Sequence, residues 1–136
     1  MEETKIHVVL IDDDRFQVTA LKKMVDDTGL AGTVNIFADG KEAIEYLTQL
    51  TQLGDTLPHV IFLDINMPVM NAWKFLDAYG RFKRLLYRPI DVYVVTSSTS
   101  GFDMAQSRHY ATVKGYITKP ITKQKIQQVL SGISII

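Results

Sequence analysis

The sequence predicts an α/β domain built on a doubly wound, five-stranded parallel sheet. Short apolar runs rich in β-branched residues alternate with segments of helical spacing along the 136 residues. Such an alternation is typical of parallel strands joined by right-handed helical crossovers. With 46% hydrophobic and 22% charged residues, the chain also has the size and composition of one globular domain with one core.

The strands are predicted from apolar runs bounded by turn residues. The first, third and fourth runs are apolar throughout, as expected of strands covered on both faces of a parallel sheet. The fifth run is the weakest. The expected strands are Ile6–Ile11, Thr33–Phe37, Val60–Leu63, Ile90–Val95 and Gly115–Thr118.

The helices are predicted from apolar residues three and four positions apart. The clearest helix covers Lys41–Leu50, where the apolar side chains form one stripe. Gly29 is expected to end the first helix and Thr122 to cap the last. A polar surface loop is expected at Thr51–Pro58. The other helices are expected at Arg15–Thr28, Ala72–Arg84, Asp103–Tyr110 and Lys123–Leu130.

Composition and charge exclude several classes of protein. The 15 basic and 15 acidic residues cancel, whereas a nucleic-acid partner normally requires a basic face. The absence of cysteine excludes disulfides and thiolate metal sites and fits a reducing compartment, so we expect a cytoplasmic protein. The sequence contains neither the features of a signal peptide nor an apolar run long enough to span a membrane.

Acidic residues follow two of the expected strands. Asp12 and Asp13 come after the first strand and Asp64 after the third, and ligands of open parallel sheets bind at the carboxyl ends of strands. Crowded carboxylates destabilise a fold unless a cation neutralises them. Their hard oxygen ligands predict a Mg²⁺ site. The alternative is helix capping, which accounts well for Asp14 but needs only one acid.

Polar residues also follow the fourth and fifth strands. Thr96 begins a run of hydroxyl side chains, and Lys119 precedes a proline. A lysine could neutralise an anion on Asp64 while a hydroxyl donates a hydrogen bond to it, as phosphoryl transfer requires. The alternative for Lys119 is a solvated surface lysine, and Ser98–Ser100 is expected to be a flexible turn.

Four motifs at the strand ends resemble the receiver domain of bacterial two-component response regulators. They are IDDD, FLDINMPVMNAWKF around Asp64, VVTSS and GYITKP. The resemblance covers nearly the whole chain and implies a flavodoxin-like fold with strand order 2-1-3-4-5. It is closest to small, stand-alone, chemotaxis-regulator-like receivers of the Bacteroidetes type. Because the chain ends at Ile136, we expect a single receiver domain over residues 1–136 without an output domain.

The resemblance implies a role for each acid. Asp64 is expected to be the phosphoacceptor and a ligand of Mg²⁺. Asp13 is expected to bind the metal directly, as is the backbone carbonyl of Asn66. Asp12 is expected to act through water.

The resemblance also implies how the phosphoryl group is stabilised and read. Thr96 is expected to hold a phosphoryl oxygen and Lys119 to form an ion pair with it. Movement of Thr96 is expected to open space for Tyr116, although Tyr116 can also be an ordinary aromatic residue at a strand face. The open site predicts a phosphoryl state that lasts minutes rather than days, lost by autodephosphorylation.

The resemblance implies partners as well. A histidine kinase or phosphotransfer protein is expected as phosphodonor, with small donors such as acetyl phosphate as substitutes. A downstream protein is expected to read the state by contact, with no nucleic acid or membrane involved directly. The chain is expected to be a monomer or a weak, phosphorylation-dependent dimer.

Two features depart from the usual receiver pattern. Ala72 stands where glycine is common after the Met-Pro step, which predicts modest strain or a shifted turn. The long segment Leu47–Pro58 predicts either an extended second helix or a longer loop, with consequences for partner choice.

Two alternative functions fit the sequence less well. An inert receiver used only for protein interaction is disfavoured, because such forms usually lose an acid, the acceptor or the lysine. A phosphatase or phosphotransferase with an aspartyl-phosphate intermediate usually has a second aspartate two residues after the nucleophile. Here that residue is Asn66, which cannot act as a general acid, so a turnover enzyme is not expected.

Other conspicuous side chains are expected to be structural. Trp73 and Phe75 are expected to pack on the sheet or against the neighbouring insertion. His7, His59 and His109 lack the paired spacing of metal ligands.

Overall fold

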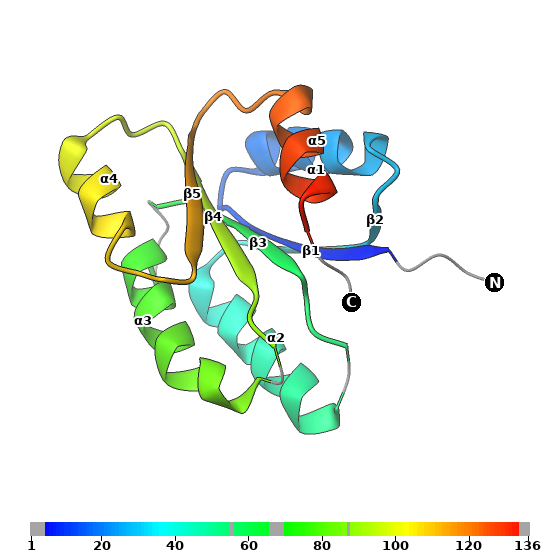
Figure 1. The fold of residues 1–136 in the computed structure, drawn as a ribbon, viewed down its shortest axis with the longest axis vertical. Coiled ribbons are helices and arrows are strands. Elements are labelled where there is room, and N and C mark those ends of the chain that lie inside the picture. The colour runs from blue at the N-terminus through cyan, green and yellow to red at the C-terminus, as the bar shows by residue number, and fades with distance from the viewer. Residues whose placement is uncertain (1–4, 55, 66–69, 87, 134–136) are drawn as a thin grey trace.

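The computed structural model describes residues 5–54, 56–65, 70–86 and 88–133. It contains a five-stranded parallel sheet in the order β2-β1-β3-β4-β5 (Figure 1), as the sequence predicts. The strands are β1 (Ile6–Ile11), β2 (Ala31–Phe37), β3 (Val60–Leu63), β4 (Asp91–Thr96) and β5 (Val113–Thr118). The helices are α1 (Arg15–Asp27), α2 (Gly40–Leu53), α3 (Ala72–Phe82), the 3₁₀ turn η1 (Lys83–Leu85), α4 (Gly101–Ser107) and α5 (Lys123–Ser131).

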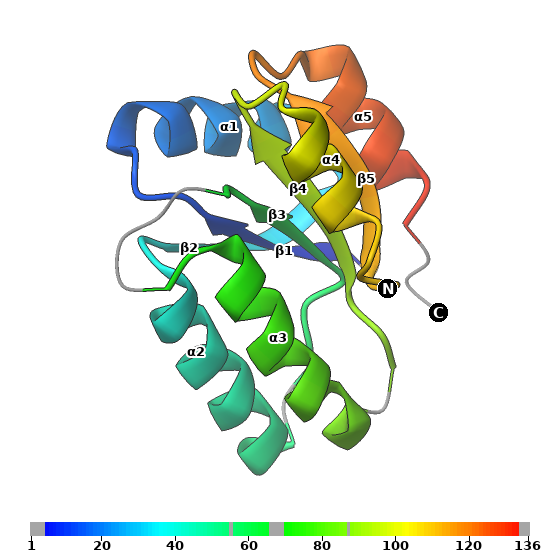
Figure 2. The same cartoon turned by 90° about the vertical axis from the view of Figure 1, so that its left-hand side faces the viewer.

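Helices cover both faces of the sheet, so the interior consists of two apolar layers. In one layer, Val8 and Leu10 of β1 pack with the apolar sides of α1 and α5. In the other layer, Val9 and Ile11 pack with α2 and α3. Figure 2 shows α2 and α3 together on one side and α1 and α5 on the other, with α4 beside β5. Covering both faces explains why β3 is apolar throughout and β1 is apolar except at His7.

Side-chain caps set where several helices begin. The Asp14 carboxylate accepts hydrogen bonds from the first amides of α1, and the Thr122 hydroxyl caps α5, both as expected. Gly29 follows the end of α1 with a φ of +72°, a conformation that glycine adopts freely.

Several expected element boundaries differ from the structure, and two of the differences bear on the loops near the site and on the segment after α2. Helix α4 begins at Gly101 rather than Asp103, because the Ser100 hydroxyl caps its amino end. The Ser98 hydroxyl also donates to the Asp103 carboxylate at 2.7 Å, so Ser98–Ser100 is an ordered cap rather than a flexible turn. Helix α2 continues to Leu53 and ends at Gly54, whose φ is +71°, so much of the expected loop is helical. Of the two alternatives for this segment, the extended helix is confirmed.

The prediction of backbone strain at Ala72 is also wrong. Ala72 is the first residue of α3, and its amide donates to the Ile65 carbonyl at 3.1 Å. A helical backbone suits alanine, and its methyl group is fully buried in the core. The turn that precedes α3 includes residues 66–69, which lie outside the described part of the chain.

The remaining conspicuous side chains either pack against the protein or, in the case of His109, face the solvent. Phe75 is fully buried in the core, and Trp73 stacks on Tyr110 with ring centroids 6.1 Å apart. The His59 ring accepts a hydrogen bond from the His7 amide at 3.0 Å, and the His7 ring contacts an asparagine. His109 is exposed. Among the described helices, none is long and apolar enough to cross a membrane.

Candidate functional site

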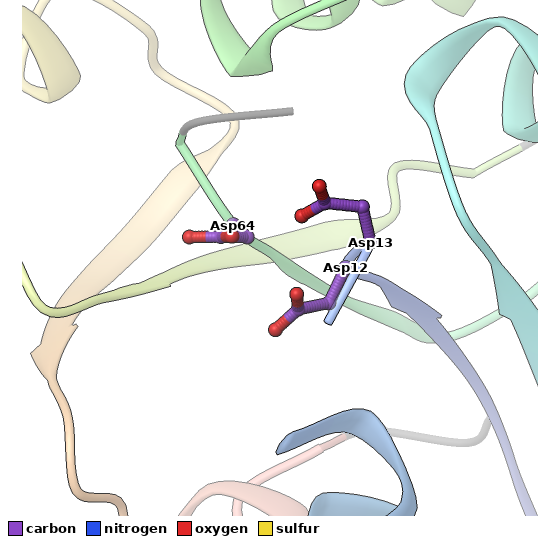
Figure 3. Close-up of side chains that lie close together, drawn as sticks. All are labelled: Asp12, Asp13 and Asp64. Atoms are coloured by element: carbon purple, nitrogen blue, oxygen red, sulfur yellow. The ribbon is translucent and has the colours of Figure 1, made fainter. Parts of the chain in front are cut away.

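Three carboxylates lie together at the carboxyl edge of the sheet. Asp12 and Asp13 follow β1, and Asp64 follows the neighbouring strand β3. One oxygen from each lies within 4.8 Å of the others, and Figure 3 shows the three side chains gathered over the two strand ends. The Asp64 amide donates to the Ile11 carbonyl at 3.0 Å, which holds these ends side by side.

The three acids differ in their access to water. Asp12 is 7% exposed and the Asp64 side chain 13%, whereas Asp13 is exposed. The pKa of Asp64 is raised to about 6, chiefly by burial and also by the charges of Asp12 and Asp13, against the opposing effects of Lys119 and the Ile65 amide. The site therefore contains more negative charge than its protein surroundings neutralise.

Lys119 is the basic side chain at this site. Its ammonium nitrogen lies 3.1 Å from an Asp12 oxygen and 3.8 Å from an Asp64 oxygen. Its amide donates to the Thr96 carbonyl at 2.7 Å, which ties the start of the β5–α5 loop to the end of β4. The alternative of a freely solvated surface lysine is wrong, because the side chain is only 16% exposed.

The acidic cluster fits a hard divalent cation. Three carboxylates from two strand ends supply oxygen ligands but not a complete coordination shell, the arrangement in which Mg²⁺ keeps water molecules. Burial is the main cause of the raised pKa of Asp64, and the charges of Asp12 and Asp13 add to it, so a cation at this site would relieve repulsion among the acids. The expected third ligand, the backbone carbonyl of Asn66, lies outside the described residues.

Thr96 and Tyr116 each form a hydrogen bond with the backbone of Ser98 in the β4–α4 loop. Thr96 is 1% exposed, and its hydroxyl oxygen accepts a hydrogen bond from the Ser98 amide at 3.2 Å. The Tyr116 hydroxyl donates to the Ser98 carbonyl at 2.9 Å. Ser98 therefore links the side chain at the end of β4 to the aromatic residue on β5, a connection that the sequence did not suggest.

Gln17 is a site residue that the sequence reasoning missed. It is the third residue of α1, and its side-chain oxygen accepts a hydrogen bond from the Lys119 ammonium group. Glutamine three residues after a capping residue often turns back toward the cap. That pattern, Asp14 followed by Gln17, indicates a side chain directed over the helix start, but not its contact with Lys119.

This fold and site define a class of α/β protein with an acidic, lysine-containing site at the carboxyl edge of a parallel sheet. A family model described as the response regulator receiver domain matches residues 8–131. The chain belongs to this family, whose members act in two-component signal transduction. Receiver domains are phosphoacceptors rather than classical enzymes, and they bind Mg²⁺ at an acidic pocket.

Individual relatives agree with this assignment. A probable methanogenesis regulatory protein, FilR2 of Methanothrix harundinacea, is 29% identical over 93% of the chain and 79% of its own length. A two-component response regulator from Cytophaga hutchinsonii superposes with a TM-score of 0.84 at 27% identity, covering 94% of this chain and 96% of that one. Another relative is longer, since the chain spans 53% of the transcriptional regulatory protein CitT of Halalkalibacterium halodurans.

One structural neighbour was solved with a metal. The receiver domain of the sensor histidine kinase PA1611 from Pseudomonas aeruginosa has a magnesium ion coordinated in its active site cleft. It superposes with a TM-score of 0.77 over 94% of this chain and 96% of that one. Because the two sequences are only 17% identical, this superposition shows a common fold alone.

Proposed function

We propose that this chain is a phosphorylation-controlled switch in which Asp64 is the phosphoacceptor. The observation that carries the proposal is the position of Asp64, whose carboxylate lies within the acidic cluster and 3.8 Å from the Lys119 ammonium group. A histidine kinase or phosphotransfer protein is the proposed donor, acting in the cytoplasm, and a downstream protein the proposed reader.

Asp13, Asp64 and the backbone carbonyl of Asn66 are the proposed metal ligands, with Asp12 acting through water. When bound, Mg²⁺ neutralises charge on the acids and on the incoming phosphoryl oxygens. The exposure of Asp13 leaves it open to the solvent from which a hydrated cation arrives. The buried Asp12 is already paired with Lys119, which suits an indirect role.

In the proposed transfer, an Asp64 oxygen forms a bond to phosphorus while the nitrogen–phosphorus bond of the donor breaks. The donor imidazole keeps the electron pair of that bond. Lys119 moves from its carboxylate partners to a phosphoryl oxygen, and the Thr96 hydroxyl donates to another. Lys119 is held close to Asp64 before transfer, at 3.8 Å, which lowers the entropic cost of the reaction.

The proposed switch depends on the two hydrogen bonds at Ser98. When Thr96 turns toward the phosphoryl group, its hydroxyl oxygen leaves the Ser98 amide, and the β4–α4 loop loses one of its restraints. Tyr116 is bonded to the carbonyl of the same residue, so a shift of this loop displaces its ring. Phosphorylation then biases a two-state equilibrium between loop arrangements.

We further propose that the phosphoryl state decays by autodephosphorylation within minutes and that the chain does not turn over external substrates. Water reaches the open side of the site near the exposed Asp13. The residue two positions after Asp64 is Asn66, whose side-chain amide cannot serve as the general acid that turnover of a second substrate requires.

Intact mass after treatment with acetyl phosphate and Mg²⁺ tests the proposal. One phosphoryl group is expected on the unaltered chain and none on Asp64→Asn. Asp14→Asn is the matched control, because it makes the same chemical change two residues from Asp12 and keeps a good helix cap. Labelling of Asp64→Asn equal to that of the unaltered chain would overturn the assignment.

A further inference from the structure

A hollow lies near the amino-terminal ends of the strands, whereas the acidic site lies at their carboxyl ends. It has a volume of about 470 Å³ and lies between the end of α3, the turn η1 and the beginnings of β4 and β5. A hollow of this size accommodates a small organic molecule. The residues that line it precede β4 and begin β5, whereas Asp64 follows β3 at the carboxyl ends of the strands, so the two sites lie at opposite ends of the parallel strands.

The lining of this hollow is basic. Lys83, Arg84, Arg88 and Lys114 line it, and none of the described acidic side chains does. Within the described part of the chain, no carboxylate forms an ion pair with Lys83, Arg84 or Lys114. Because the whole chain has equal numbers of acidic and basic residues, this is a local concentration of positive charge that favours an anion.

Arg88 is held in place by the backbone beneath it. Its guanidinium group donates to the Pro58 carbonyl at 2.7 Å and to the Leu57 carbonyl. The group is therefore ordered before any ligand arrives, which reduces the entropic cost of binding.

The inner surface of the hollow is apolar. Leu86, which is partly buried against the core, and Pro89, which is exposed, present apolar surface there, with the fully buried Ile90 behind them. The Tyr79 hydroxyl already forms a hydrogen bond within the protein, because it accepts from the Ile90 amide at 3.2 Å. An apolar floor below a basic rim suits a flat ring attached to phosphate groups, since the ring displaces water while the rim binds the charge.

We propose that this basic hollow binds a small organic diphosphate of the nucleotide class. Lys83 and Arg84 on η1 and Lys114 on β5 contact the phosphates from two sides, and the ring lies over Leu86 and Pro89. Arginine in particular pairs with two phosphate oxygens at once. The site is independent of the proposed phosphoacceptor, so each can fail without the other.

Titration of the full-length chain with ADP at constant ionic strength, followed by amide NMR and calorimetry, tests the proposal. Saturable binding is expected, with shifts concentrated in residues 83–86 and 111–114. Lys83→Ala/Arg84→Ala is expected to weaken binding by about tenfold or more, because two charge-assisted contacts are lost. Both side chains are exposed, so the fold is expected to persist. Arg88 is left unchanged because it anchors Leu57 and Pro58.

Three controls make the result decisive. Lys22→Ala/Lys23→Ala removes the same charge from α1 and is expected to leave ADP binding unchanged, as is Asp64→Asn. Adenosine without phosphates is expected to bind much more weakly than ADP. Equal weakening by the α1 variant, equal binding of adenosine, or displacement of ADP by sulfate at the same ionic strength would each overturn the proposal.

Discussion

Lys119 lies closer to Asp12 than to Asp64, with its ammonium nitrogen 3.1 Å from the first carboxylate and 3.8 Å from the second. The same nitrogen also donates to the side-chain oxygen of Gln17. Before phosphorylation the lysine is thus divided among three oxygen-bearing groups. To stabilise a phosphoryl group on Asp64, it has to give up part of this coordination.

Gln17→Ala is expected to lengthen the lifetime of the phosphoryl group. The substitution removes one competitor for Lys119, which is then more available to the phosphoryl oxygens. Because Gln17 is exposed, we expect a change of about two- to fivefold, corresponding to about 0.5–1 kcal/mol. The decay rate of the acyl phosphate, followed by intact mass, measures this effect.

Gln17→Glu is the matched variant for that experiment. A carboxylate at the same position attracts the ammonium group more strongly, so the lifetime is expected to fall below that of the unaltered chain. Changes in the same direction for both variants would show that Gln17 does not act through Lys119.

Asp13→Asn is expected to weaken Mg²⁺ binding by about one to two orders of magnitude, because a charged ligand becomes neutral at a partly exposed site. Calorimetric titration with MgCl₂ measures the affinity. Asp14→Asn, which alters the neighbouring capping acid, is expected to have little effect. Equal losses in the two variants would indicate a general charge effect and contradict the ligand role.

Asp64→Asn is expected to stabilise the metal-free protein at pH 8. Burial and the neighbouring acids raise the pKa of Asp64 from 3.8 to about 6, so folding favours its protonated form. Ionised Asp64 therefore lowers the free energy of unfolding by up to about 3 kcal/mol above about pH 6, and this loss disappears below about pH 4. Urea unfolding across this pH range is expected to show an advantage for the variant that shrinks as the pH falls.

Mg²⁺ provides the complementary measurement at pH 8. It is expected to stabilise the unaltered protein more than Asp64→Asn, since the cation relieves the repulsion that the substitution has already removed. A stability difference that is independent of pH would mean that the ionisation of Asp64 is not its cause.

Tyr116→Phe is expected to destabilise the β4–α4 loop. The substitution removes the hydrogen bond to the Ser98 carbonyl in a partly buried position, at a cost of about 0.5–1.5 kcal/mol. Faster amide hydrogen exchange is expected in residues 97–100. Tyr110→Phe, which loses a more exposed hydrogen bond to Asp77, is the control and is expected to change stability less. Unchanged exchange in Tyr116→Phe would remove the proposed link between Tyr116 and the loop.

The sequence predicted the sheet and the acidic cluster because both depend on local pattern and topology. Once β1 and β3 are placed as buried parallel strands, the residues that follow them have to meet at one edge, which brings Asp12, Asp13 and Asp64 together. Thr96 and Lys119 follow from the same rule for β4 and β5.

The features that the sequence missed depend on single side-chain hydrogen bonds. The end of α2 is rich in polar residues, and its Thr51 hydroxyl donates to the Leu47 carbonyl within the helix at 3.0 Å. The start of α4 depends on which of several adjacent hydroxyl groups becomes the cap, and Ser100 does. The contact of Gln17 with Lys119 joins α1 to the β5–α5 loop, and residue spacing carries no information about it.

The most direct test of the central claim is to locate the phosphoryl group in the chain. After phosphorylation with acetyl phosphate and Mg²⁺, reduction with borohydride converts an aspartyl phosphate into homoserine, which peptide mass spectrometry identifies. The structure predicts homoserine at position 64 and at none of positions 12, 13 and 14. Homoserine at one of those acids, or unmodified aspartate at position 64 in a phosphorylated chain, would contradict the account.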